Sequence, residues 1–336
     1  MTPSDADYLR AVDLLVAGEL VAIPTETVYG LGADAANPAA VAKIFAAKGR
    51  PADHPLIVHL AGHDAVDHWA EQVPDVAWEL METFWPGPLT LILKKQAWVP
   101  DAVTGGQDTV GLRVPGHPVA LELLRRFARA KGEHAGIAAP SANRFGRISP
   151  TDAEHVREEL GTAVALVLDG GPCQVGIEST IVDLSRDDAV PRILRPGHIT
   201  PERIAAVIGI TPDFPSGRPA GAVPRVSGSL DAHYAPRTAL RVVASADLAG
   251  VLPVLTAQGN RVGLLARTDA GAIVPVSGLC RLPDDPEGYA RGFYAALREL
   301  DQGGNDLIVV EALGAGSEWA AVADRLRRAA CGAGEG

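Results

Sequence analysis

The chain has 336 residues, of which 47% are hydrophobic and 21% are charged, and its formal net charge at pH 7 is -11. This length and apolar content suit a globular protein of about two domains. A strongly acidic chain is not a general binder of polyanions, so the composition excludes a protein that coats nucleic acid. Any contact with nucleic acid is therefore expected to be weak or indirect.

The cysteines and the N-terminus indicate the compartment. Cys173, Cys280 and Cys331 are far apart and form no CxxC pair, which is typical of a reducing environment. The first ten residues contain Asp5 and Asp7 and no apolar core, and no apolar run is long enough to span a bilayer. We therefore expect a cytoplasmic protein without a signal peptide or membrane contact.

The first predicted element is a helix over residues 5–17. Its periodicity places on one face the residues Leu9, Val12, Leu15 and Val16. We expect that face to pack against the core of the first domain. A second helix is predicted over residues 38–47 on the same grounds.

Between these helices, residues 20–32 read as a buried strand that ends in a polar loop. Pro24 ends the strand, and Thr25, Glu26 and Thr27 precede two glycines that let a ligand approach the backbone. Polar residues at a strand end are typical of sites in open α/β sheets. Taken alone, however, the stretch is more simply explained as a strand followed by a turn.

Residues 48–60 place two cations on a Gly/Pro loop before another strand. Lys48 and Arg50 could bind phosphate or carboxylate there, or they could simply be solvated. His54 and His59 belong to a group of four histidines that invites a metal interpretation, but His59 lies in an apolar strand and no cysteine accompanies the group. We expect no metal site.

Later strands also end in polar or cationic residues. Arg113 alternates with apolar neighbours, so it must pair either with an Asp or Glu or with an anionic ligand, and the sequence leaves both open. Residues 139–143 follow a strand of small residues with Ser141 and Asn143, and Arg195 lies at another strand end. Neither a P-loop nor a GxGxxG motif is present. The repetition predicts one cleft for an anionic, polar ligand.

The remaining chain divides into a linker and a second domain. Residues 212–236 are rich in Pro and Gly and end in His233 and Tyr234, which could cover a cleft or anchor the linker to a domain surface. Strands at 240–243, 261–266 and 307–310 alternate with helices at 286–300 and 318–328, as in a small parallel α/β domain. The predicted domains are 1–211 and 237–336.

Together these segments resemble the YrdC-like family of threonylcarbamoyl-AMP synthases in its long form. The motifs that carry the resemblance occur in family order: PTETVYGLG (24–32), KGRPADHPLIVH (48–59), FWPGPLTLIL (84–93), TVGLRVP (109–115), APSAN (139–143), GGPCQVGIEST (170–180), LRPG (194–197) and HYAP (233–236). The resemblance implies a three-layer catalytic domain with a twisted mixed sheet. A smaller Rossmann-like parallel α/β domain would follow it.

The family's activity is the ATP-dependent synthesis of threonylcarbamoyl-adenylate from L-threonine and bicarbonate, with release of pyrophosphate. A separate transferase then modifies the tRNA adenosine next to the anticodon. The resemblance implies ATP as a substrate and Mg²⁺ as its companion. It implies L-threonine contacts at Thr27, His59, Arg113, the backbone of Ala139, and Ser179. It implies ATP contacts at Arg50, His54, Thr109, Ser141, Asn143, Ser149, Arg195 and Tyr234.

Lys48 and Arg50 are the candidate catalytic residues, because cations would neutralise charge on the triphosphate. No Ser-His-Asp or Cys-His arrangement is evident, so we expect catalysis by positioning and electrostatics. The linker is expected to act as a lid over an unstable carbamate. Two rival functions are an RNA-binding module of the same fold and an enzyme that forms a carbamoyl-adenylate from carbamoyl phosphate.

Overall fold

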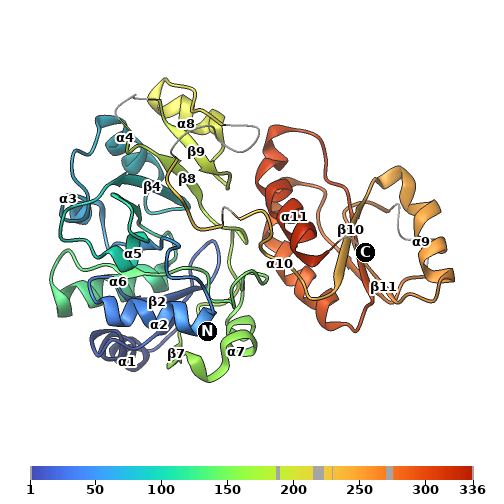
Figure 1. Ribbon diagram of the computed structural model, residues 1–336, viewed down its shortest axis with the longest axis horizontal. Helices are drawn as coiled ribbons and strands as arrows, with labels where there is room; N and C mark the ends of the chain where they lie inside the picture. The colour runs from blue at the N-terminus through green and yellow to red at the C-terminus, as the bar shows by residue number, and fades with distance from the viewer. Residues whose placement is uncertain (1, 187–189, 215–222, 229, 270–274, 335–336) are drawn as a thin grey trace. The chain divides into compact units, whose positions relative to one another are not determined.

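The structure is a computed structural model that describes residues 2–186, 190–214, 223–228, 230–269 and 275–334. The chain divides into two compact units (Figure 1). The N-terminal unit comprises residues 1–145, 150–174 and 178–229, and the C-terminal unit comprises 146–149, 175–177 and 230–336. The domain limits predicted at residues 211 and 237 remain predictions.

A nine-stranded mixed sheet forms the centre of the N-terminal unit, in the order β7-β1-β2-β6-β3-β5-β4-β8-β9. Strands β3 and β5 run parallel, as do β4 and β8, whereas β4 and β5 run antiparallel. The predicted mixed sheet is therefore confirmed. The strands are β1 (Val21–Ile23), β2 (Gly30–Asp34), β3 (Ile57–His59), β4 (Leu89–Lys94), β5 (Thr109–Arg113), β6 (Ile137–Ala138), β7 (Leu166–Val167), β8 (Thr180–Asp183) and β9 (Arg192–Arg195).

Helices connect these strands and cover the sheet. They are α1 (Asp5–Val16), α2 (Pro38–Lys48), α3 (Val66–Trp69), α4 (Asp75–Phe84), α5 (Asp101–Thr104), α6 (Pro118–Lys131), α7 (Ala153–Leu160) and α8 (Pro201–Ile208). Short 3₁₀ turns lie at His63–Ala65 and Gly161–Ala163. None of the helices in the described ranges combines the length and apolarity that a bilayer crossing needs.

The buried face of α1 differs from the sequence prediction. The prediction was wrong for Leu9 and Val16, whose exposed fractions are 60% and 43%. The buried stripe consists of Tyr8, Ala11, Val12 and Leu15. These follow the i, i+3, i+4, i+7 spacing, and Leu9 and Val16 each lie one residue beyond it. Tyr8 therefore lies on the buried side in place of Leu9, and its ring packs beneath the Arg126 guanidinium of α6, 4.7 Å from ring centre to Cζ.

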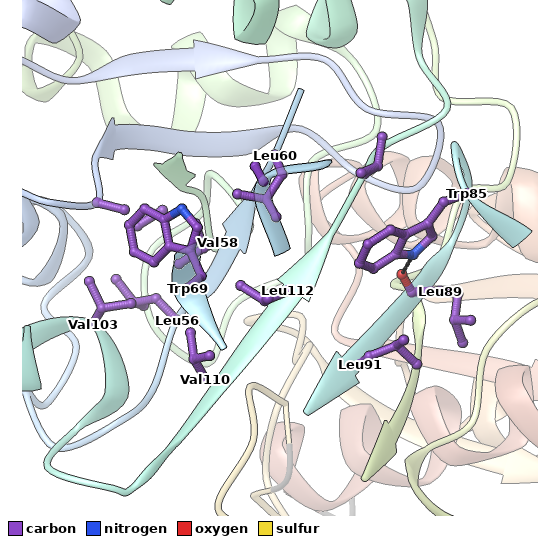
Figure 2. Packing of buried hydrophobic residues seen from close by; sticks show 14 of the residues in the cluster. Leu56, Val58, Leu60, Trp69, Trp85, Leu89, Leu91, Val103, Val110 and Leu112 are labelled. Atoms are coloured by element: carbon purple, nitrogen blue, oxygen red, sulfur yellow. Dashed lines mark hydrogen bonds between the residues drawn. The ribbon is translucent and has the colours of Figure 1, made fainter. Parts of the chain in front are cut away.

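Each face of the sheet carries its own core, which gives the unit three layers. In β1, Val21 and Ile23 pack against α1 and α6, whereas Ala22 between them packs on the opposite face. This alternation is the period of two that a strand imposes. Figure 2 shows part of the larger core, in which Trp69 and Trp85 flank side chains of β3, β4 and β5. The indole nitrogen of Trp85 donates to the carbonyl of Leu89 at 2.7 Å.

The C-terminal unit contains a four-stranded, all-parallel sheet in the order β10-β13-β11-β12. Its strands are β10 (Ala239–Val243), β11 (Val262–Ala266), β12 (Gly278–Arg281) and β13 (Leu307–Glu311), and its helices are α9 (Leu248–Ala257), α10 (Pro286–Gln302) and α11 (Ala320–Ala333). The predicted parallel α/β character is confirmed. The predicted helix at 286–300 is α10, and its buried residues include Tyr289, Phe293, Leu297 and Leu300.

Candidate functional site

Arg113, the last residue of β5, is held at each of its three guanidinium nitrogens. Its Nε donates to the carbonyl of Gly87 at 3.1 Å, and Nη1 donates to the Thr27 hydroxyl at 3.0 Å. Its Nη2 lies 2.6 Å from Oε1 of Glu26, and both side chains are buried. Of the two partners that the sequence left open, an acidic residue and an anionic ligand, the structure identifies Glu26 as the acidic one.

The loop that follows β1 is fixed by hydroxyl groups. Thr25 Oγ1 donates to the carbonyl of Val28 at 2.6 Å and accepts from the backbone N–H groups of Thr27 and Val28, each at 3.2 Å. The hydroxyls of Thr25 and Thr27 are 2.8 Å apart. Such side-chain to backbone bonds stabilise a turn, so Thr27 is presented to Arg113 by a rigid loop.

His59 ends the neighbouring strand β3, directly opposite Arg113 in the parallel register. The side chain is buried, and this burial, together with the positive charge of Arg113, lowers the pKa of His59 to about 3. The imidazole is therefore neutral at physiological pH. Ala139, just after β6, donates its backbone N–H to the carbonyl of Ile57 on β3 at 3.0 Å. The predicted threonine contacts His59, Arg113 and Ala139 thus lie on three adjacent strands.

Ser179 and Arg195 form a second polar group, at the start of β8 and the end of β9. Arg195 donates from Nε to the carbonyl of Ser179 and from Nη2 to its hydroxyl, both at 3.0 Å. The Ser179 hydroxyl also shares a 2.8 Å hydrogen bond with that of Thr90 on β4. In the sheet order β5-β4-β8-β9, this group therefore occupies the three strands that follow β5 on one side.

The end of α2 and the loop after it contribute two further cations. Lys48 is fully buried, and its Nζ donates to the carbonyls of Ser141 and Asn143, both at 2.5 Å. Burial, followed by the charge of Arg50, lowers the pKa of Lys48 well below its usual value. Arg50 Nη2 donates to the carbonyl of Pro55 at 2.9 Å and to the hydroxyl of Ser227 at 3.1 Å.

Ser227 brings two distant arginines to one residue. Its hydroxyl accepts from Arg50, and its carbonyl accepts from Arg195 Nη1 at 2.9 Å. Both arginines were predicted to contact ATP. Ser227, Glu26 and Thr90 were not among the predicted site residues, although Glu26 lies in the polar loop that the sequence indicated. Glu26 could have been suspected because a buried arginine needs a carboxylate partner.

The other predicted ATP residues lie in different places. Thr109 is buried at the start of β5, and the His54 ring meets the edge of Phe145 with ring centres 5.3 Å apart. Ser149 and Tyr234 belong to the C-terminal unit. There Tyr234 is buried, with a positive φ of 62° and its ring centre 5.7 Å from that of Tyr294. Residues 215–222 and 229 of the predicted linker lie outside the described residues.

Two family models together match almost the whole chain. The Sua5/YciO/YrdC model, described as "Telomere recombination", matches residues 13–197. A second model, described as "Threonylcarbamoyl-AMP synthase, C-terminal domain", matches residues 199–331.

Full-length relatives carry the same description. The threonylcarbamoyl-AMP synthase of Pyrococcus abyssi is 39% identical over 327 residues, covering 95% of this chain and 92% of the relative. That of Bacillus subtilis is 40% identical over 340 residues, covering 99% of this chain and 95% of the relative. The crystal structure of P. abyssi Sua5 complexed with L-threonine superposes with a TM-score of 0.89 at 36% identity, covering 99% of this chain and 96% of that one.

Proposed function

The chain belongs to the Sua5/YrdC family of threonylcarbamoyl-AMP synthases, and on that premise we propose that it converts L-threonine, bicarbonate and ATP into threonylcarbamoyl-adenylate and pyrophosphate. One observation carries this proposal at the level of the site. The guanidinium of Arg113, buried at a strand end, already binds a carboxylate, that of Glu26. The position is therefore suited to the carboxylate of an amino acid.

L-Threonine would bind around Arg113. A guanidinium can offer a carboxylate two parallel hydrogen bonds, and the bonds from Arg113 to Gly87 and Thr27 fix its orientation beforehand. The hydroxyls of Thr27 and Ser179 and the backbone of Ala139 supply further polar groups. Neutral His59 can accept or donate a hydrogen bond there without adding charge.

ATP would bind on the side of the site that Arg50 and Arg195 occupy. Both guanidiniums reach Ser227, so they lie close enough to act on one triphosphate. Further contacts are proposed from His54, Thr109, Ser141, Asn143, Ser149 and Tyr234. Mg²⁺ would enter with ATP, bound mainly by phosphate oxygens. Within the described ranges, no three His, Cys, Asp or Glu side chains converge on a metal position.

The chemistry requires positioning more than a protein nucleophile. The threonine amine attacks bicarbonate to give a carbamate with loss of water, and the carbamate oxygen then attacks the α-phosphorus and displaces pyrophosphate. Negative charge gathers in the second step, where Arg50, Arg195 and Lys48 would stabilise it. Lys48 is anchored to two carbonyls, so its main contribution would be to hold the loop of Ser141 and Asn143 in place.

The end of the linker would protect the intermediate from water. Val226 is buried against Ile92 and Ile181, and the next residue, Ser227, binds both arginines. This segment therefore covers the side proposed for ATP and would have to shift when the nucleotide enters. We propose that the 212–236 segment acts as a lid on this basis.

Pyrophosphate release is the test of the function. It should require L-threonine, bicarbonate and ATP together, and Arg113→Ala should lower kcat/KM for threonine about 10²–10³-fold. Arg157→Ala, which removes an exposed arginine paired with Glu154, is the matched control and should change little. Release driven by carbamoyl phosphate without threonine, or an Arg113→Ala effect confined to ATP, would refute the proposal.

The product would pass to a separate transferase that modifies the tRNA adenosine next to the anticodon. We propose a cytoplasmic location from the cysteine usage, since all three cysteines are free. The chain's net charge of -11 favours weak or indirect tRNA contact over the rival RNA-binding function.

A further inference from the structure

Glu26 contacts the cation that the proposed function assigns to the substrate carboxylate. Its Oε1 lies 2.6 Å from Arg113 Nη2, and the exposed fractions of the two side chains are 10% and 4%. Burial is the largest influence on the Glu26 carboxyl and would raise its pKa, but the charge of Arg113 together with hydrogen bonds from Arg113 and the backbone N–H of Gly116 lowers the pKa overall. The two groups are thus an anion and a cation whose charges cancel inside the protein.

Apart from Glu26, the groups that contact Arg113 directly add no full charge. Thr27 contributes a hydroxyl and Gly87 a carbonyl to Arg113. The pKa of His59 is lowered to about 3, so its imidazole is neutral. Burial also lowers the pKa of His117, the other imidazole close enough to interact with Glu26. Arg113, Glu26 and the groups that contact Arg113 therefore have a net charge of zero near pH 7, whereas Arg195, which binds Ser179, belongs to the side proposed for ATP.

We propose that Glu26 is a specificity-determining residue, which balances the charge of Arg113 so that the subsite accepts a zwitterion and refuses simple anions. A zwitterion brings one charge of each sign and leaves the charges around the Glu26–Arg113 pair balanced. A lone carboxylate would leave that pair with an uncompensated negative charge, which is costly away from water. The inference rests on the proposed binding of threonine at Arg113.

This selectivity has a use in the proposed reaction. Bicarbonate and ATP are both anions and must bind beside Arg113 rather than on it. An unpaired, buried guanidinium would attract either of them. With Glu26 in place, the ligand that gains most from Arg113 is one that also carries an ammonium group, because its positive charge offsets the extra carboxylate.

Calorimetric titration of the full-length chain with three ligands tests the inference. The ligands are L-threonine, 3-hydroxybutyrate (which lacks the amine) and L-threoninamide (which lacks the carboxylate). In the unmodified protein both singly charged analogues should bind at least about tenfold more weakly than threonine, because each lacks one charged contact. An anion that binds as tightly as threonine would overturn the inference without any variant.

Substitution separates the charge of Glu26 from its shape. Glu26→Gln should increase the affinity for 3-hydroxybutyrate relative to that for threonine by about tenfold, equivalent to about 1.4 kcal/mol. It should decrease the affinity for L-threoninamide. Glu26→Asp keeps the charge and should retain the original order. Glu122→Gln, which removes a carboxylate paired with Arg126 elsewhere, is the matched control.

The outcomes distinguish the two proposals. Failure of threonine to bind the unmodified protein would defeat the proposed function itself. Threonine binding with an unchanged ligand order in folded Glu26→Gln would defeat only the role of Glu26. The same would follow if Glu26→Asp behaved like Glu26→Gln, since shape rather than charge would then decide.

Discussion

Replacing His59 should change how the stability of the N-terminal unit depends on pH. The imidazole is buried beside Arg113, and its pKa is lowered from 6.5 to about 3. The folded protein therefore keeps His59 neutral across the range in which the unfolded chain takes up a proton. Stability is highest above pH 6.5 and is lost as the pH falls from about 6.5 toward 3.

The size of the effect follows from the two pKa values. Each unit of difference is worth about 1.4 kcal/mol, so the full loss near pH 3 is about 5 kcal/mol. Between pH 7 and pH 5 the His59 side chain of the unfolded protein becomes almost fully protonated. Over this range His59 should therefore reduce the free energy of unfolding by about 2 kcal/mol. The glutamine of His59→Gln cannot take up a proton. The free energy of unfolding of this variant should therefore fall by about 2 kcal/mol less between pH 7 and pH 5, whatever the substitution does to stability at pH 7.

Urea unfolding at pH 5, 6, 7 and 8, followed by tryptophan fluorescence, measures the slope. Trp69 and Trp85 are buried in the N-terminal unit and report on its core. Histidines that titrate similarly in both proteins cancel in the comparison, and His63→Gln, at an exposed position, is the matched control. An equal loss of stability between pH 7 and pH 5 in His59→Gln and the unmodified protein would show that His59 is not held neutral by burial.

Two further predictions concern the start of β8. Thr180 is buried, and its hydroxyl donates to the carbonyl of Ile199 and accepts from the N–H of the same residue. Thr180→Val leaves both groups without a partner and should lower the free energy of unfolding by about 2–6 kcal/mol, whereas the control Thr83→Val, at an exposed site, should not. Equal urea midpoints for Thr180→Val and the unmodified protein would contradict this prediction. A Cβ at Gly197 would lie 2.7 Å from the Ser179 carbonyl carbon, so Gly197→Ala should displace Ser179. This displacement should raise KM for threonine about tenfold or more. An unchanged KM would argue against Ser179 as a threonine contact.

Periodicity and turn chemistry predicted most of the architecture. The alternation of strands and helices predicted the parallel C-terminal sheet. Pro24 and Arg195 correctly indicated the ends of β1 and β9, and His59 lies in a strand, β3, as expected. Elements without a clear pattern were missed. Helix α9 contains Pro253, and strand β12 is a short edge strand whose Leu279 side chain is 47% exposed, so neither gives a simple period.

The site residues could be predicted by type, but their partners could not. Arginines and hydroxyls at strand ends indicated an anionic ligand, yet Glu26 and Arg113 are far apart in sequence and only the order of strands brings them together. No spacing rule connects a loop after β1 with the end of β5. Ser227 is harder still, because it follows a Pro/Gly-rich segment that has no period of its own.

A second reason is that backbone carbonyls orient the cations. Arg113 donates to Gly87, Arg195 to Ser179, and Lys48 to Ser141 and Asn143, in each case to a main-chain oxygen. Every residue carries such an oxygen, so the sequence gives no signal for it. These hydrogen bonds orient each side chain without placing a negative charge beside it. Glu26 is the exception, because it contributes a full negative charge to Arg113, and a charge inside a binding site acts on which ligands can enter as well as on the fold.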